Sequence, residues 1–149
     1  MIPALALFIF LDQITKAIFA ERDFFFIGIH FHPMQNEALP FGLDFGNPSN
    51  FFVLFIAYVV LGFVISRYGA VTRKVWWGKI MFIAGASANL VDRIMFGYVR
   101  DFIDLQLGFV FNLADVFIVI GLLMVLFSKN EKVVVEAGDG GVEKRPGLF

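Results

Sequence analysis

The stretch FNLADVFIVIGLLMVLF, residues 111–127, is an apolar run whose only charged residue is Asp115. A carboxylate at the centre of a bilayer costs roughly 2.5 to 3.5 kcal/mol, so a partner or a chemical role is needed to hold it there. A second acid, Asp101, precedes the run. The short stretch between them, residues 102–110, can fold back and bring both carboxylates to one end of the predicted helix.

The composition around this run is that of a membrane protein. Of the 149 residues, 59% are hydrophobic, and the mean hydropathy is +0.80. Soluble domains are nearer 45 to 50% apolar, as a rough average. The net charge of -1 gives no reason to expect nucleic acid as a partner, since binding to phosphate requires a basic surface. The absence of cysteine excludes disulfides, thiolate metal ligands and a cysteine nucleophile.

The hydropathy pattern predicts an all-α membrane protein with four transmembrane helices and a small outward-facing β-element. Four segments approach the roughly 20 residues that a spanning helix needs. They are residues 2–20, 51–66, 76–96 and 111–127. Residues 1–128 are expected to form one membrane domain. Residues 129–149, rich in glycine and charge, are predicted to be a disordered polar tail.

The β-element is predicted within residues 23–45. In the stretch IGIHFH, residues 27–32, apolar residues alternate with glycine or histidine, which is typical of a half-buried strand. His30 and His32 share one face of this strand, so a metal site is conceivable. Without a third ligand nearby in the sequence, a solvated face is favoured and no metal is predicted. The phenylalanines of this segment suit the headgroup boundary of a membrane.

The basic residues predict the orientation. The link between the second and third segments, together with the start of the third, carries four basic residues and no acid, whereas the only basic residues of the other two links are Arg22 and Arg100. Because short basic links stay in the cytoplasm, both termini are expected there, with residues 21–50 and 97–110 outside. The four basic residues are Arg67, Arg73, Lys74 and Lys79.

Polar residues of the spans gather in the outer leaflet under this topology. They fall at spacings of three or four, which places each pair on one helix face. For Asp12, Lys16 and Asp92, structural charge pairing is the favoured interpretation. Arg93 and Asn89 are candidates for orienting a substrate backbone. The pairs are Asp12 with Lys16, Asn89 with Arg93, and Asn112 with Asp115.

The two acids, Asp101 and Asp115, allow two interpretations. The structural one is a buried ion pair or a loop-capping interaction, or, for Asp101, an ordinary solvated acid. The chemical one is an aspartyl hydrolase, in which one ionised carboxylate takes a proton from water and its protonated partner polarises the scissile carbonyl. Such a pair shares a proton and needs no metal or cofactor. A serine mechanism with Ser87 and Lys16 is disfavoured, because nothing supplies an obvious oxyanion hole.

Five ordered motifs make this chain resemble the bacterial lipoprotein signal peptidases, or signal peptidase II, a family of four-helix membrane aspartyl peptidases. The resemblance covers nearly all of the chain except the tail. The motifs are DQITK at residues 12–16, NEALPFG at 36–42, NLVDR at 89–93, GYVRDF at 97–102 and FNLAD at 111–115.

The resemblance implies an aspartic endopeptidase of the bacterial cytoplasmic (inner) membrane, with its peptidase domain over residues 1–128 and its active site toward the outer face. It implies cleavage of prolipoproteins just before a diacylglyceryl-modified cysteine, in contact with membrane lipid, and inhibition by globomycin-like cyclic peptides. Asp101 and Asp115 would be the catalytic pair. The residues expected to contact substrate or to order the site are Asn36, Asn89, Arg93 and Asn112.

The chain departs from the family pattern at Ala38, Pro40, Ala88 and Arg100. A methyl group at Ala38 or Ala88 could tighten the approach of the backbone to substrate, and a cation at position 100 is expected to favour the ionised form of Asp101. The alternative from another class is a non-enzymatic transporter subunit or assembly factor with an intramembrane charge network. The four segments show no inverted repeat, which weakens the transporter version.

Overall fold

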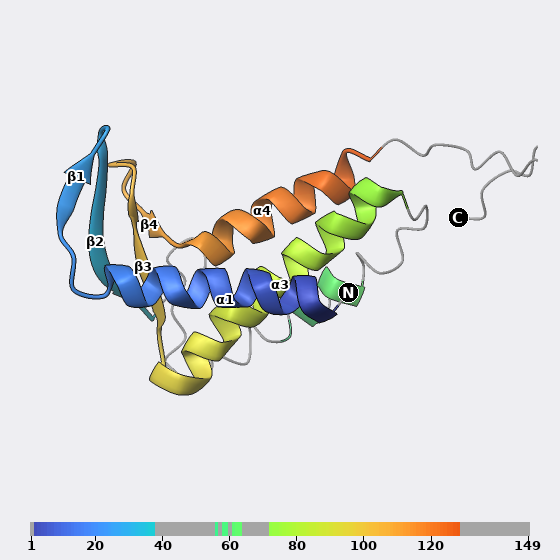
Figure 1. The fold of residues 1–149 in the computed structure, drawn as a ribbon, viewed down its shortest axis with the longest axis horizontal. Helices are drawn as coiled ribbons and strands as arrows, with labels where there is room; N and C mark the ends of the chain where they lie inside the picture. Colours follow the sequence, from blue (N-terminus) through green and yellow to red (C-terminus); the bar gives the residue numbers. More distant parts are fainter. Residues whose placement is uncertain (1, 38–55, 57, 60, 64–71, 129–149) are drawn as a thin grey trace, which may run out of the picture.

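The computed structural model describes residues 2–37, 56, 58, 59, 61–63 and 72–128. Within these ranges three long helices extend from a four-stranded antiparallel sheet that lies at one end of the molecule (Figure 1). The predicted span over residues 51–66 lies largely outside the described residues, and those described there, 56, 58, 59 and 61–63, are helical. The predicted tail, residues 129–149, and the family departures at positions 38 and 40 also lie outside the described residues.

The described helices follow the predicted apolar segments closely. They are α1 (Ile2–Phe19), α3 (Arg73–Phe96) and α4 (Leu113–Leu126). Among the described helices, α1 alone is both long and apolar enough to cross a membrane, and α4 is a shorter apolar helix. A mostly helical chain with a small sheet is therefore confirmed, whereas four membrane-crossing helices stay a prediction.

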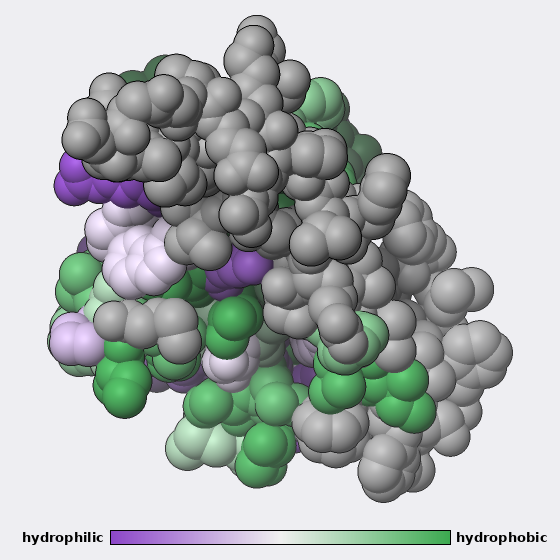
Figure 2. All heavy atoms as spheres, turned by 90° about the vertical axis from the view of Figure 1, so that its right-hand side faces the viewer, coloured by the Kyte–Doolittle hydropathy of each residue, from purple (hydrophilic) through white to green (hydrophobic). Residues whose placement is uncertain are grey.

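The faces of α1 are arranged as in a membrane helix. Asp12 and Lys16 are buried, whereas Phe10, Ile14 and Ile18 are exposed on another face. A soluble helix does the opposite, with its apolar stripe toward the core. Figure 2, which looks at the end of the molecule away from the sheet, shows hydrophobic side chains gathered at the lower left and lower centre of this face.

Helices α3 and α4 pack closely through small residues. A Cβ atom added at Gly85 would collide with the backbone oxygen of Ala114, and one at Gly78 would lie 2.8 Å from the backbone oxygen of Gly121. Small residues at such contacts let helix backbones approach, which is typical of membrane helix pairs. The contact fixes the first turn of α4 against the middle of α3.

The sheet has the order β1-β2-β3-β4. Its strands are β1 (Phe24–Phe26), β2 (Ile29–Asn36), β3 (Val99–Asp104) and β4 (Val110–Phe111). The prediction of a continuous strand over residues 27–32 is wrong at its start. Ile27 and Gly28 have φ of 49° and 79° and form the turn between β1 and β2.

A bulge interrupts the pairing of β2 with β3. Phe31 pairs with Ile103 and Met34 with Asp101, so His32 and Pro33 together oppose the single residue Phe102. Proline lacks the N–H that a regular ladder needs, and a bulge accommodates it. Strand β3 then leads through β4 into α4, which begins at Leu113 rather than at residue 111, because Phe111 pairs with Ile103.

Candidate active site

Asn112 forms the N-terminal cap of α4 and positions Asp115. The side-chain oxygen of Asn112 accepts a hydrogen bond from the backbone N–H of Asp115 at 3.0 Å, and the backbone N–H of Asn112 donates to Oδ2 of Asp115 at 3.1 Å. This is a reciprocal capping box, here with Asp at its third helical position. The carboxylate that the sequence places in an apolar run therefore lies at a helix N-terminus, where the helix dipole favours negative charge.

Asp101 on β3 is 2% exposed and accepts hydrogen bonds from two side-chain amides. Asn112 Nδ2 donates to its Oδ1 at 2.6 Å, and Asn36 Nδ2 donates to its Oδ2 at 2.8 Å. Burial raises the pKa of the Asp101 carboxyl to about 6 despite these two donors, and the negative charge of Asp115 adds to the increase. Asp101 and Asp115 are therefore close enough for their charges to interact. Asn112 forms hydrogen bonds with both residues.

Asn89 on α3 links Asp115 to the buried cation Lys16. Its Nδ2 donates to Oδ1 of Asp115 at 2.8 Å, while its Oδ1 accepts from Lys16 Nζ at 2.9 Å and from Asn112 Nδ2 at 3.2 Å. Each amide atom therefore has a defined partner, which fixes the orientation of the amide. Asn89 and Asn112 therefore lie together with the two acids, in the cluster that the sequence predicted.

Lys16 is held by two buried acids on different helices. Its Nζ lies 2.8 Å from Asp12 Oδ2 and 3.1 Å from Asp92 Oδ2. Asp12 Oδ1 also accepts a hydrogen bond of 2.8 Å from the backbone N–H of Ala114 in the first turn of α4. These contacts join α1, α3 and α4 next to Asn89 and Asp115. The Lys16 ammonium is paired with Asp12 and Asp92, which disfavours its use as the base for Ser87.

Arg100 does not act on Asp101 as the sequence predicted. Its Nη2 donates to Asp92 Oδ1 and to Gln13 Oε1, both at 2.7 Å, and its guanidinium lies 4.5 Å above the ring centroid of Phe96. The expectation that Arg100 governs the ionisation of Asp101 is wrong, because the main influences on the pKa of Asp101 are burial, its two amide donors and the charges of Asp115 and Lys16. Arg100 instead completes the charge pairing of Asp92.

Two residues of the site were given no role from the sequence. Gln13 Nε2 donates to Asp92 Oδ1 at 3.0 Å, so Gln13 joins Arg100 and Asp92 in one network. The sequence feature that could have indicated this role is its position in the motif at residues 12–16. The Tyr58 side chain hydrogen-bonds Asn89. Tyr58, Asp101 and Asp115 each act electrostatically on Arg93, so Arg93 belongs to the same cluster.

A cavity of ≈ 280 Å³ opens beside Asp101. It lies between the end of α1 and strands β2 and β3. Its lining combines polar and aromatic side chains, among them Lys16, Phe19, Gln35, Tyr98 and Phe102.

Comparison with known proteins agrees with this arrangement. The family described as signal peptidase (SPase) II matches residues 4–129. A lipoprotein signal peptidase of Thermodesulfovibrio yellowstonii is 35% identical over 138 residues, which cover 85% of this chain and 91% of that protein. One from Halothermothrix orenii is 36% identical over 144 residues, covering 84% and 92%.

The fold also has a solved counterpart. A bacterial membrane enzyme determined by the in meso method at 2.3 Å resolution superimposes with a TM-score of 0.68, at 23% identity and 84% coverage of each chain. At that identity the likeness concerns the fold.

The fold and the family match define a peptidase of bacterial membranes. The chain belongs to the signal peptidase II family, as its five motifs predicted. This membership favours the peptidase interpretation over a transporter subunit or assembly factor.

Proposed function

We propose that this protein removes the signal peptide from diacylglyceryl-modified prolipoproteins by cleaving just before the lipidated cysteine, with Asp101 and Asp115 as its catalytic pair. The family membership supports the substrate class, since its relatives are lipoprotein signal peptidases. The observation that carries the catalytic assignment is the shared partner Asn112. It donates to Asp101 through its side chain and caps the helix that bears Asp115.

The mechanism needs one ionised and one protonated carboxyl group. Burial raises the pKa of Asp101 to about 6, so the pair keeps one shared proton more readily than two exposed carboxyl groups would. The ionised carboxylate of the pair takes a proton from water as the hydroxyl oxygen bonds to the scissile carbonyl carbon, while the protonated carboxyl group hydrogen-bonds the carbonyl oxygen. The tetrahedral intermediate then collapses, the C–N bond breaks, and the proton taken from water passes from the carboxyl group that accepted it to the leaving amine.

The remaining polar residues divide into substrate-facing and structural groups. Asn36, Asn89, Arg93 and Asn112 orient the carboxylates or the substrate backbone. Asp12, Lys16 and Asp92 hold the helices together beneath them, in agreement with their burial and mutual pairing. A diacylglyceryl chain would run along the exposed apolar side chains of the helices, within the lipid, and globomycin-like peptides would compete for the same site.

The proposal includes a topology and a domain division. Four helices, over residues 2–20, 51–66, 76–96 and 111–127, cross the cytoplasmic membrane with both termini inside, and the sheet rests on the outer surface. Exposed Phe25, Phe26 and Ile27 at the hairpin tip support contact of the sheet with lipid headgroups. The peptidase domain is residues 1–128, and residues 129–149 are a polar extension.

A reconstituted reaction tests this function. Purified protein in detergent is mixed with a prolipoprotein carrying the diacylglyceryl cysteine, and released signal peptide is measured by gel mobility and mass. Cleavage immediately before the modified cysteine is expected. The same precursor without diacylglycerol is the matched control and should remain intact. Release from both precursors, or from neither, would overturn the assignment.

A further inference from the structure

His30, His32 and Asp104 form a second cluster on the sheet, apart from the two carboxylates of the active site. His30 on β2 pairs directly with Asp104 on β3, and His32 lies two residues further along β2 on the same face. Their ligand atoms all lie within 4.8 Å of one another. Asp104 is the third ligand that the sequence around the two histidines does not offer.

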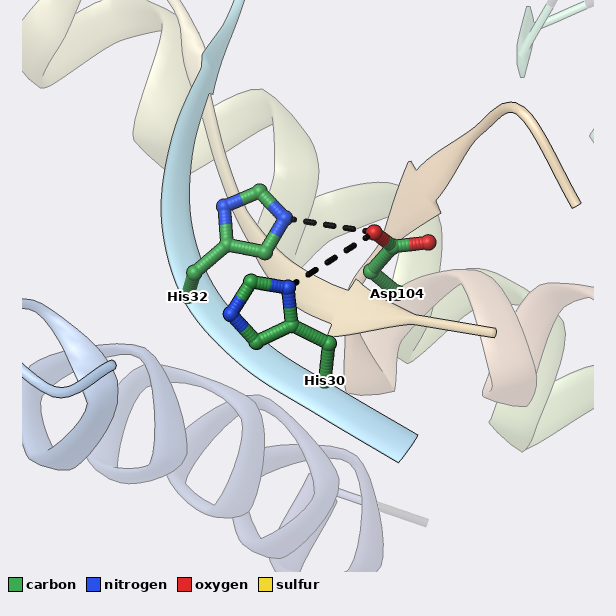
Figure 3. Close-up of side chains that lie close together, drawn as sticks. All are labelled: His30, His32 and Asp104. Carbon is green, nitrogen blue, oxygen red and sulfur yellow. Dashed lines mark ion pairs between the residues drawn. The ribbon is translucent and has the colours of Figure 1, made fainter. Parts of the chain in front are cut away.

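The three side chains converge on one point. His32 Nε2 lies 3.5 Å and His30 Nδ1 lies 4.0 Å from the same atom, Asp104 Oδ2. Figure 3 shows both rings directing a nitrogen at this oxygen. Ligands of a tetrahedral zinc ion at 2.0 to 2.1 Å are separated by about 3.4 Å, so small rotations of the side chains would accommodate an ion.

The groups around the cluster orient its ligands. His30 Nε2, the nitrogen turned away from the cluster, lies 2.7 Å from Asp23 Oδ1. Asp104 Oδ1 accepts a hydrogen bond of 2.6 Å from the backbone N–H of Gln106, which leaves Oδ2 for an ion. A carboxylate on the outer nitrogen of a histidine is the arrangement that commonly fixes metal-binding imidazoles. Asp23 would therefore hold His30 with its proton on Nε2 and its free electron pair on Nδ1.

We propose that His30, His32 and Asp104 bind one divalent transition-metal ion of the Zn²⁺ class, with water in the fourth position. Two imidazoles and one carboxylate suit Zn²⁺, whereas Mg²⁺ and Ca²⁺ prefer oxygen ligands. All three side chains are only partly exposed, with 21% to 25% of each side chain accessible, so the ion can enter from solvent. The ion would tie β2 to β3 beside the bulge and would take no part in peptide cleavage.

The composition of the chain makes a direct test possible. It has two histidines, both in the proposed site, and no cysteine, so labelling histidine with ¹⁵N reports on this site alone. The full-length protein is purified in detergent through an affinity tag without histidine and treated with a chelator. Imidazole ¹⁵N signals are then recorded while Zn²⁺ is added, with Mg²⁺ as the control ion.

The expected result is binding of one Zn²⁺ per chain, with a metal-bound Nδ1 in His30 and a metal-bound Nε2 in His32, and no change with Mg²⁺. Unchanged signals at a large molar excess of Zn²⁺ would overturn the proposal and leave the cluster as an ion pair. Binding through Nε2 of His30 would also overturn it, because that nitrogen faces Asp23.

Variants separate this site from unspecific binding. His32→Ala and Asp104→Asn should each weaken Zn²⁺ binding by more than about tenfold, and Asp23→Ala, which removes the outer carboxylate, by about tenfold. Glu21→Gln, which removes an exposed carboxylate near the hairpin, should not change it. Circular dichroism checks that each variant remains folded. Equal affinity in Asp104→Asn and the unsubstituted protein would exclude the three-ligand site.

Discussion

The side-chain amide of Asn112 donates a hydrogen bond of 2.6 Å to the carboxylate of Asp101, eleven residues earlier in the chain. Because Asn112 is also the cap of α4, one side chain connects the sheet that carries Asp101 to the helix that carries Asp115. Its side-chain oxygen and its side-chain nitrogen are both used, by different partners. Helix initiation and placement of the two acids therefore depend on the same residue.

Replacing Asn112 tests this dual role. Asn112→Ala should lower the free energy of unfolding by about 1 kcal/mol, as loss of a cap usually does. It should reduce cleavage far more, because Asp101 loses one of its two amide donors. Thr72→Ala is the matched control, since Thr72 caps α3 through a 3.2 Å bond from Val75 N and contacts neither acid. Equal cleavage by the two variants, measured at equal folded fraction, would contradict a role of Asn112 beyond capping.

The pH dependence of cleavage should reflect the shared proton. With the pKa of Asp101 near 6, raising the pH through about 6 removes the proton that the pair needs. The value of kcat/KM, which reports on the free enzyme, should therefore fall as the pH rises through that range. Tryptophan fluorescence at each pH checks that the fold persists. A constant kcat/KM from pH 5 to about 8 would mean that cleavage does not depend on a proton held by Asp101.

Hydropathy predicts the described helices well because each is set by a local pattern. The apolar run around Asp115 and the spacing of Asp12 and Lys16 lie within single helices, so neighbouring residues are enough to predict them. The register of the sheet is different. Strand β3 has a mixed sequence, VRDFID, and pairs with β2 across more than sixty residues of chain, for which no local pattern exists.

The same distinction explains which site residues were found. Asp101, Asp115 and the asparagines stand out as polar residues in or beside apolar segments. The role of Gln13 depends on Arg100, 87 residues away, and Asp104 joins the histidines through strand pairing. Arg100 was misassigned because proximity in sequence to Asp101 does not decide where a long side chain points.

Lys16 is expected to be essential for stability. Lys16→Met leaves Asp12 and Asp92 buried without their shared cation, and breaking a buried pair typically costs about 3 to 5 kcal/mol. Lys74→Met, an exposed lysine in the first turn of α3, should change the free energy of unfolding by less than about 0.5 kcal/mol. Denaturation in mixed detergents, followed by circular dichroism, compares the two. A similar small effect for both would show that the network contributes little.

The topology can be tested with single cysteines, since the chain has none of its own. Leu107→Cys lies at an exposed position beside the sheet, and Ser128→Cys lies at the far end of α4, where Ser128 Oγ is 3.3 Å from Thr72 Oγ1. A membrane-impermeant thiol reagent on intact spheroplasts should label position 107, and position 128 only after permeabilisation. The reverse pattern would place the carboxylates on the cytoplasmic side, away from exported substrates.

The most direct measurement is the single-turnover cleavage rate of Asp101→Asn and Asp115→Asn on a diacylglyceryl-modified prolipoprotein. Each change keeps the side-chain shape but removes a proton-transfer group, and such losses are typically of order 100-fold to 10,000-fold. Both variants should remain folded and membrane-inserted with cleavage reduced at least to this extent, while Glu21→Gln, lacking an exposed acid, cleaves normally. Near-normal cleavage by either aspartate variant would contradict the catalytic pair.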